Sequence, residues 1–175
     1  NYRPVSLTSV LCKVLETIIR DRISTFLERE NLLNLAQHGF SHGRSCLTNL
    51  LTMMENFSKR LDRGEEVEAV FLDLSKAFDT VNHRFLLKKL RNFGISKKVV
   101  KWIGSFLGNR TLKVRVQDAI SESIPITSGV SQCSLLGPLL FLIYKNDLQD
   151  NVSSDCSLFA DNIKVIGFTK DHEVI

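Results

Sequence analysis

The sequence predicts an α+β fold of about one domain. Several stretches place apolar residues at helical spacing, whereas others alternate apolar and polar residues as strands do. The chain has 175 residues, of which 43% are hydrophobic and 24% charged, proportions typical of a globular protein with a sizeable core. Nine glycines and three prolines are too few for a long linker or a disordered segment.

The first part of the chain predicts two helices. Residues 10–29 place apolar side chains at helical spacing after Ser9, a residue type that caps helix N-termini. Residues 46–61 repeat the pattern between Ser45, a second expected cap, and Gly64, a residue type that commonly follows a helix end.

A strand and two further helices are expected in the middle of the chain. Residues 67–74 read Val-Glu-Ala-Val-Phe-Leu-Asp-Leu, a mostly apolar run that predicts a strand. A helix over residues 82–92 is expected to stop at Gly94. The next helix is expected to begin after Ser96 and to carry apolar residues through Phe106.

The last part predicts a hairpin, a helix and two short strands. Residues 112–116 alternate apolar and basic side chains, which indicates one strand of a hairpin that returns over residues 120–126. An apolar helix is expected over residues 138–148, since its first residue is a proline and proline suits the first turn. Short strands are expected over residues 156–159 and 163–166.

The basic residues are concentrated in one stretch. Residues 80–117 contain ten Lys and Arg residues and no Asp or Glu, although the whole chain has 23 basic against 19 acidic residues. Five of them recur at helical spacing, and a basic helix face is what binding to a phosphate backbone requires; a solvated surface is the other interpretation. The candidate nucleic-acid-binding residues are Arg84, Lys88, Arg91, Lys97, Lys101, Lys113 and Arg115.

The cysteines and the apolar runs exclude several classes of protein. The four cysteines stand far apart without a Cys-x-x-Cys pair, which argues against a disulfide framework or a zinc site and indicates a reducing, intracellular compartment. No apolar run reaches the roughly 18 residues of a membrane span, so no membrane partner is expected. Position 1 is not a methionine, and the chain is expected to be a piece of a longer one.

Two acidic residues occupy unusual positions for carboxylates. Asp73 lies near the end of the most hydrophobic expected strand, and Asp161 lies at the tip of the expected last hairpin. A carboxylate near a core is costly without a counter-charge, often a metal ion, and Mg²⁺ prefers oxygen ligands. The pair indicates nucleotidyl chemistry on a nucleic acid; the alternative is that each is a strand-end or turn residue.

The surroundings of these acids resemble a known family. Residues 71–79, Phe-Leu-Asp-Leu-Ser-Lys-Ala-Phe-Asp, resemble the first catalytic motif of reverse transcriptases in non-LTR (LINE-type) retrotransposons. Residues 128–138 resemble the second palm motif of that family, and residues 159–162, Phe-Ala-Asp-Asn, resemble the third. Residues 1–7 and 37–45 are similar to the fingers motifs, so that five motifs follow in the family's order. Within this family, the chain most resembles the polymerases of jockey- or CR1-like elements.

This resemblance implies a fold and an activity. The expected architecture is a right-hand polymerase, fingers-like over about residues 1–65 and palm-like over about residues 66–175, with an antiparallel palm sheet backed by helices and the thumb missing. The implied activity is RNA-directed DNA polymerisation, in which two Mg²⁺ ions, or Mn²⁺ in their place, assist transfer from a dNTP to a primer 3′-hydroxyl. The implied partners are an RNA template, a DNA primer or target and dNTPs, in the nucleus and cytoplasm.

The resemblance also implies roles for single residues. Asp73 and Asp161 would hold the metal ions. Phe78 would be the sugar gate that excludes a 2′-hydroxyl, although plain core packing explains an aromatic residue there equally well. Gln132 would contact the incoming nucleotide or the template, and Gly129 lies in a loop whose glycines let the backbone approach nucleic acid.

The resemblance implies roles for two further residues. Arg44 would face the triphosphate or template phosphates, with an ordinary surface arginine as the alternative. Asp79 would be a structural hydrogen-bonding or cap residue rather than a metal ligand.

The sequence departs from the family pattern at four motif positions. Asn162 replaces the second aspartate of the third motif, Cys133 a glycine, Ser131 a proline and Ser41 an arginine. An amide oxygen is a weak metal ligand, so we expect impaired rather than abolished chemistry. The alternative is a catalytically inactive nucleic-acid-binding remnant or a domesticated module; a relic without a selected role is a third possibility.

Overall fold

The structure of the chain is a computed structural model that describes residues 9–34, 36–41, 43–152 and 154–169. The fingers motif expected in residues 1–7 therefore lies outside the described residues. Helices and antiparallel strands are mixed along the chain, which confirms the α+β class. Within the residues that the structure describes, no helix has both the length and the apolar character to cross a membrane.

The elements follow the expected order. They are α1 (Val10–Arg29), α2 (Cys46–Leu61), β1 (Glu66–Asp73), α3 (His83–Asn92), α4 (Lys97–Leu107), β2 (Arg110–Leu112), β3 (Arg115–Val116), β4 (Ala119–Ile120), β5 (Ile124–Ile126), α5 (Gly137–Lys145), the 3-10 helix η1 (Gln149–Asn151), β6 (Asp155–Phe159) and β7 (Asn162–Thr169). The expected caps are present: the hydroxyl of Ser9 accepts from the N–H of Cys12 at 3.3 Å, and that of Ser45 accepts from the N–H of Thr48 at 3.1 Å.

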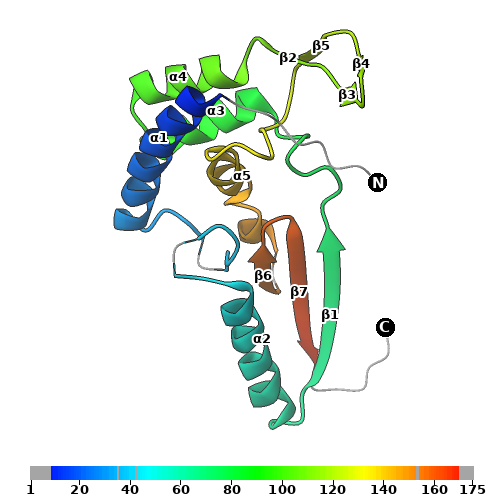
Figure 1. The fold of residues 1–175 in the computed structure, drawn as a ribbon. Coiled ribbons are helices and arrows are strands. Elements are labelled where there is room, and N and C mark those ends of the chain that lie inside the picture. Colours follow the sequence, from blue (N-terminus) through cyan, green and yellow to red (C-terminus); the bar gives the residue numbers. More distant parts are fainter. Residues whose placement is uncertain (1–8, 35, 42, 153, 170–175) are drawn as a thin grey trace. The chain divides into compact units, whose positions relative to one another are not determined.

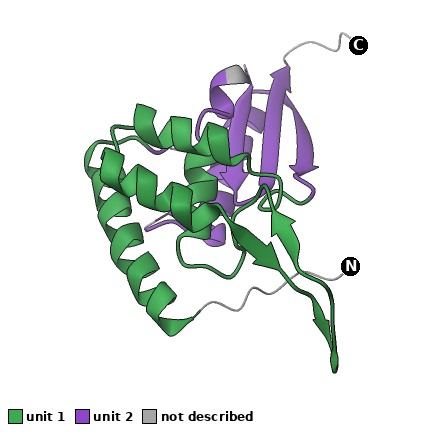
Figure 2. Cartoon of the chain, turned by 90° about the horizontal axis from the view of Figure 1, so that it is seen from above, with its two compact units in different colours: residues 1–32, 76–144 green, residues 33–75, 145–175 purple. Residues whose placement is uncertain are grey.

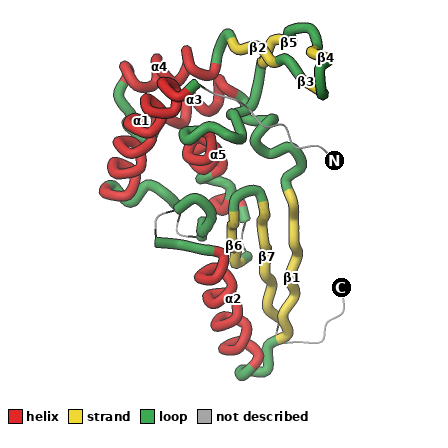
Figure 3. The backbone as a smooth tube through the Cα atoms, viewed as in Figure 1, coloured by secondary structure: helices red, strands yellow, loops and turns green. Residues whose placement is uncertain are grey.

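Three expected elements differ in detail. Strand β7 runs over Asn162–Thr169 rather than over residues 163–166. Helix α5 ends at Lys145 rather than at Leu148, and after it the N–H of Leu148 donates to the carbonyl of Lys145 at 3.0 Å, in a three-residue turn instead of a further α-helical turn. The expected single hairpin is two short ladders, β2–β5 and β3–β4 (Figure 3). Between them the hydroxyl of Ser121 accepts from the N–H of Val114 at 2.9 Å, in place of a backbone carbonyl.

The chain forms two compact units, and each is built from two separate stretches (Figure 2). Unit 1 comprises residues 1–32 and 76–144, and unit 2 comprises residues 33–75 and 145–175. Unit 1 is mainly helical, and α3 packs against α4 after Gly94, whose φ of +83° lets the chain turn there. Its core is formed by buried side chains of several helices, among them Leu27, Leu86, Leu90, Ile103, Leu107 and Leu140.

Unit 2 is a three-stranded antiparallel sheet with one long helix beside it. The strand order is β1–β7–β6, and α2 packs on β1 and β6 (Figure 1). The guanidinium of Arg60 on α2 lies 4.4 Å from the ring centre of Phe168 on β7 and also pairs with the buried carboxylate of Glu65 at 2.9 Å. Leu158 and Ile163 provide the buried apolar contacts of the β6–β7 hairpin.

Candidate functional site

The strand register of unit 2 gathers three predicted catalytic residues at one end of the sheet. Asp73, the last residue of β1, is paired with Asn162, the first residue of β7. Asp161 immediately precedes Asn162 in the β6–β7 turn, and its carbonyl accepts from the N–H of Leu74 at 3.2 Å. Asp73 and Asn162 are exposed and Asp161 is half-buried, and all three residues lie at the same end of neighbouring strands.

The turn that carries Asp161 has an unusual backbone. Phe159 pairs with Asn162, which leaves a two-residue loop of Ala160 and Asp161. Ala160 has a φ of +52°, in the left-handed region that glycine favours and that carries a penalty for other residues. Neighbouring contacts must therefore hold this turn in place.

Two such contacts come from elsewhere in unit 2. The ammonium of Lys145, the last residue of α5, donates a hydrogen bond to the carbonyl of Ala160. On another side Gly39 lies so close that a Cβ there would be 2.4 Å from the backbone nitrogen of Ala160. Neither residue was assigned a role from the sequence. In the sequence, Lys145 is marked only as a single charged residue in an otherwise apolar helical run.

Lys145 places a buried cation near the carboxylate of Asp161. Its side chain is 5% exposed, and this burial lowers the pKa of the amine to about 8, while the negative charge of Asp161 acts in the opposite direction. Burial prevails because an ammonium is strongly hydrated and loses that hydration inside the unit.

A pocket of about 260 Å³ opens beside Asp73. It is lined by Cys46, Asn49, Phe71, Leu72, Asp73, Phe159, Asn162, Ile163 and Lys164. The ammonium of Lys164 donates to the side-chain oxygen of the buried Asn49 at 3.2 Å, which fixes both side chains at the pocket wall. The pocket thus combines aromatic walls with one cation and one carboxylate, and neither Asn49 nor Lys164 was a sequence candidate.

Arg44 lies in unit 2, and its side chain is half-buried rather than fully exposed. Its guanidinium donates to the carbonyl of Gln37 at 3.0 Å. The pKa of His38 is lowered, first by burial and then by the positive charges of Arg44 and Lys164. Two cations therefore lie near this imidazole, which favours its neutral form.

The donor set of unit 2 suits a hard divalent cation. Asp73 and Asp161 supply carboxylate oxygens, the ligands that Mg²⁺ prefers. In the described part of the chain, no group of three or more His, Cys, Asp and Glu side chains is arranged to hold a metal ion. A cation bound here would take its remaining ligands from water, backbone oxygens or substrate phosphates, as Mg²⁺ commonly does.

The other sequence candidates lie in unit 1. The amide of Gln132 donates to the carboxylate of Asp79 at 3.2 Å, which gives Asp79 the hydrogen-bonding role expected for it. Phe78 is half-buried and stacks on Phe141 with ring centres 4.5 Å apart, so the core-packing interpretation accounts for its position in this unit.

The backbone conformation and the close packing at Gly129 both favour glycine at this position. Its φ is +86°, and a Cβ there would lie 2.8–3.0 Å from backbone atoms of Asp79. Its carbonyl accepts from the imidazole of His83 at 2.7 Å and from the guanidinium of Arg110 at 2.9 Å. The loop is therefore packed tightly against the segment that follows β1.

The residues that depart from the family pattern differ in environment. Cys133 is exposed, and the hydroxyl of Ser41 donates to the carbonyl of Gly39 at 3.4 Å. The hydroxyl of Ser131 is buried without a hydrogen-bond partner among the described residues. Asn162 is exposed, is paired with Asp73 in the strand register and directly follows Asp161 in the chain.

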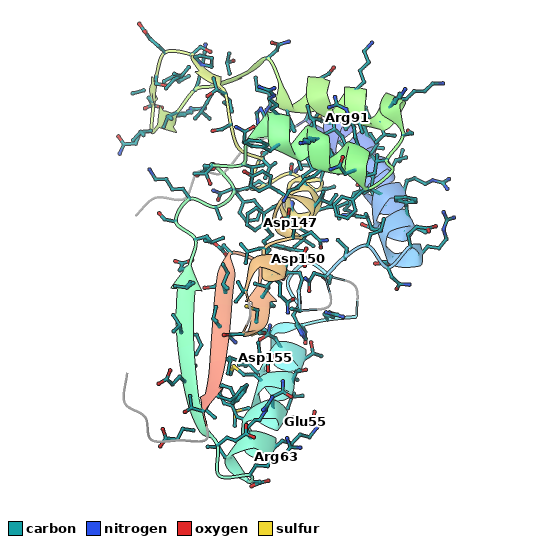
Figure 4. All side chains as sticks on the ribbon, turned by 180° about the vertical axis from the view of Figure 1, so that it is seen from behind. Glu55, Arg63, Arg91, Asp147, Asp150 and Asp155 are labelled. Carbon is teal, nitrogen blue, oxygen red and sulfur yellow. The ribbon has the colours of Figure 1, made fainter. Side chains whose placement is uncertain are left out.

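The predicted nucleic-acid-binding residues are exposed in unit 1. Arg84, Lys88 and Arg91 lie on α3, where Figure 4 labels Arg91, and Lys97 and Lys101 lie on α4. Lys113 and Arg115 lie on the hairpin that follows. The ion pairs found among the described residues involve none of these seven, and the guanidinium of Arg115 donates to the carbonyl of Gln117 at 3.0 Å.

Comparisons with known proteins give related sequences over almost the whole chain. Residues 1–174 match the family described as reverse transcriptase (RNA-dependent DNA polymerase). The chain is 34% identical to the probable RNA-directed DNA polymerase from transposon X-element of Drosophila melanogaster, over 94% of this chain and 19% of that protein.

Two other similar proteins come from mobile elements of insects. The RNA-directed DNA polymerase from mobile element jockey of Drosophila funebris is 35% identical over 100% of this chain and 19% of that protein. The retrovirus-related Pol polyprotein from type-1 retrotransposable element R2 of Popillia japonica is 29% identical over 98% of this chain and 24% of that protein. The chain thus spans about a fifth to a quarter of the length of these curated relatives.

Proposed function

Because this chain belongs to the reverse transcriptase family, we propose that it carries the nucleotidyl-transfer centre of a non-LTR retrotransposon RNA-directed DNA polymerase. In this reaction the 3′-hydroxyl of a DNA primer attacks the α-phosphorus of a deoxynucleoside triphosphate paired with an RNA template, and pyrophosphate leaves. The observation that carries the proposal is the pairing of Asp73 with Asn162 beside Asp161.

The two carboxylates have the central roles in this proposal. Asp73 and Asp161 would hold two Mg²⁺ ions, which, when bound, activate the attacking hydroxyl and stabilise the leaving oxygen. Because Asp73 is exposed and Asp161 only half-buried, phosphate oxygens would have room to complete the coordination. Asn162 would contribute an amide oxygen in place of a carboxylate, which lowers the negative charge of the site and weakens its hold on the cations.

The remaining candidates would bind substrates and nucleic acid. Phe78 and Gln132 would contact the incoming nucleotide, with Gly129 shaping the loop, and Arg44 would contact phosphates. The exposed basic side chains of α3, α4 and the hairpin would bind the phosphate backbone of the template–primer duplex. In the family's architecture, residues 1–65 are the fingers-like part and residues 66–175 the palm-like part, inside a longer polymerase that acts in the nucleus and cytoplasm.

Metal binding is the direct test of the carboxylate roles. Mn²⁺, in place of Mg²⁺, is titrated into the 175-residue chain and the free ion is followed by electron paramagnetic resonance. We expect saturable binding that weakens at least about tenfold in Asp73→Asn and in Asp161→Asn, since each loses a charged ligand. Asp118→Asn, on an exposed turn of unit 1, serves as the matched control. Equal binding in all four proteins would overturn the proposal.

Primer extension tests the reaction itself. Residues 1–175 replace the matching segment of the jockey polymerase of Drosophila funebris, to which they align over their full length. Extension of oligo(dT) on poly(rA) that is lost in Asp73→Asn supports catalysis by this centre. Extension that survives this substitution contradicts it.

A second function is favoured by one observation. Asn162 stands where the family has an acid, while the seven basic side chains of unit 1 remain exposed, which suits a nucleic-acid-binding module without catalysis. Such a module binds nucleic acid with strong salt dependence and without dependence on a divalent metal. Binding to an RNA–DNA duplex that is unchanged by EDTA, together with no extension in the chimera, would favour it over the polymerase.

A further inference from the structure

The turn between β6 and β7 is short and conformationally demanding. Its two residues, Ala160 and Asp161, connect the paired Phe159 and Asn162. In a two-residue hairpin loop a positive φ is normally supplied by glycine, asparagine or aspartate, yet here Ala160 adopts +52°. The turn sequence alone therefore does not explain the orientation of the Asp161 backbone, and contacts from outside the turn must contribute.

Lys145 supplies a contact from one direction. Its ammonium donates to the Ala160 carbonyl, and its side chain is only 5% exposed. A buried ammonium is costly unless acceptors replace its hydration, so the carbonyl is part of what holds the amine at this position. The same bond fixes the peptide that joins Ala160 to Asp161, because the accepting carbonyl belongs to that peptide.

Gly39 supplies a contact from a second direction. A Cβ at this residue would lie 2.4 Å from the nitrogen and 3.2 Å from the Cα of Ala160, so the turn rests directly on a glycine backbone. The segment before it is held to β6, since the N–H of His38 donates to the carbonyl of Leu158 at 2.9 Å and the N–H of Leu158 donates to the carbonyl of Ala36 at 3.0 Å. The surface behind the turn is therefore itself anchored.

We propose that Lys145 and Gly39 are positioning residues that clamp the Ala160–Asp161 turn and so hold the Asp161 carboxylate in the orientation needed to bind a divalent cation. Lys145 acts through the Ala160 carbonyl, and Gly39 acts by leaving space for the turn backbone. The cation-binding part of this proposal rests on the proposed function, whereas the clamp itself does not.

The sign of the effect on metal binding separates positioning from simple charge repulsion. Through charge alone, an ammonium near Asp161 repels a divalent cation, so its removal in Lys145→Met would tighten Mn²⁺ binding. If Lys145 positions the carboxylate, the same substitution weakens binding because Asp161 is no longer held. The two explanations therefore predict opposite changes in the same dissociation constant.

The test combines amide hydrogen exchange with Mn²⁺ titration on the 175-residue chain. In Lys145→Met and in Gly39→Ala we expect exchange in a peptide covering residues 158–163 to accelerate at least about tenfold, with Mn²⁺ binding weakened about fivefold or more. Lys145→Arg keeps a cationic donor, so this variant is expected to retain most of the protection from exchange and most of the Mn²⁺ affinity. Gly167→Ala is the matched control, since a Cβ there would meet its nearest atom at 3.9 Å.

Each result decides the proposal. Unchanged exchange in Lys145→Met, in a chain whose other peptides retain native exchange, overturns the clamp. Faster exchange with unchanged or tighter Mn²⁺ binding overturns the link to the cation. If the unsubstituted chain binds no Mn²⁺, the proposed function and the link to the cation fail together, while the exchange measurement still decides whether the clamp exists.

Discussion

The carboxylate of Glu16 accepts the backbone N–H of Leu136 at 3.1 Å, although 120 residues separate the two in the sequence. Glu16 lies on α1 and is fully buried, and Leu136 immediately precedes α5. The N–H groups at a helix start lack intrahelical partners and favour a negative group, so Glu16 joins α1 to the beginning of α5 within unit 1. The loop that ends at Leu136 and leads into α5 also contains Gln132, one of the residues predicted to contact the substrate.

Loss of this contact is expected to destabilise unit 1. Glu16→Ala leaves the buried Leu136 N–H without its acceptor and creates a cavity, so we expect the free energy of unfolding to fall by about 3 kcal/mol. Glu16→Gln keeps an acceptor and should lose about 1 kcal/mol or less. Urea unfolding followed by circular dichroism measures both, with the exposed Glu28→Ala on the same helix as control. A loss of stability in Glu28→Ala equal to that in Glu16→Ala would contradict this role.

Lys145 is expected to make stability depend on alkaline pH. Burial lowers the pKa of its amine to about 8 in the folded chain, whereas the unfolded chain has the ordinary value of 10.5. Between these values the unfolded state binds a proton that the folded state does not, so stability rises with pH, and below pH 8 the contribution of this group is constant. The rise amounts to roughly 3 kcal/mol.

Urea unfolding at pH 7, 8, 9 and 10 in EDTA measures this dependence. Lys145→Met should remove the rise, since no buried amine then titrates. Lys98→Met, at an exposed position of α4, should retain it. An identical pH profile in the chain and in Lys145→Met would show that this amine is not buried as a cation.

Much of the fold could be predicted from the sequence because its signals are local. The caps Ser9, Ser45 and Ser96, together with apolar periodicity, located helices α1, α2 and α4 to within a residue. The predicted end of α5 at Leu148 was wrong, since the helix ends at Lys145 and residues beyond it make long-range contacts, such as that of the Asn146 side chain with the N–H of Asn34, 112 residues away in the sequence. Periodicity carries no information about such a partner.

The candidate site was predictable only where a motif marks it. Asp73 and Asp161 were identified from strand position and family resemblance, and the register of β1 with β7 brings their segments together. Lys145 was missed, and Gly39 was given no role although it lies in the motif of residues 37–45, because both act through contacts with Ala160 that the sequence does not show. For Phe78, an aromatic residue at a strand end has the same sequence signal whether it packs in a core or contacts a substrate.

Gly129 is expected to tolerate no side chain. Gly129→Ala introduces a Cβ at 2.8–3.0 Å from the Asp79 backbone and places alanine at a φ of +86°, so we expect a loss of roughly 2 kcal/mol or more. Gly104→Ala is the control, because that glycine lies in α4 and its Cβ would meet Leu87 at 3.4 Å. In Gly104→Ala the gain in helix propensity offsets the cost of the close contact with Leu87, so the free energy of unfolding should change by no more than about 1 kcal/mol. Comparable losses in the two variants, measured by thermal unfolding, would contradict the packing argument.

The basic residues of unit 1 are expected to act through salt-dependent phosphate contacts. Replacing Lys88 by Gln removes one exposed cation from α3, and the slope of log affinity against log salt for an RNA–DNA duplex should become shallower by about one. Fluorescence anisotropy at several salt concentrations measures the slope. Lys59→Gln, whose lysine is paired with Glu55 on α2, is the control and should leave it unchanged. Equal slopes for the chain and Lys88→Gln would exclude this lysine from the interface.

Asn162→Asp is expected to strengthen the cation site. The new carboxylate would stand opposite Asp73 and next to Asp161, where a third negative charge at an exposed sheet edge increases attraction for a divalent cation. We expect Mn²⁺ to bind about tenfold more tightly and primer extension by the jockey chimera to increase. Asn92→Asp, exposed on α3 of unit 1, adds the same charge elsewhere and should change neither. If both variants tighten Mn²⁺ binding equally, the gain comes from net charge, and position 162 is not a metal-ligand position. If only Asn162→Asp binds Mn²⁺ more tightly, the amide of Asn162 limits the cation affinity of this site.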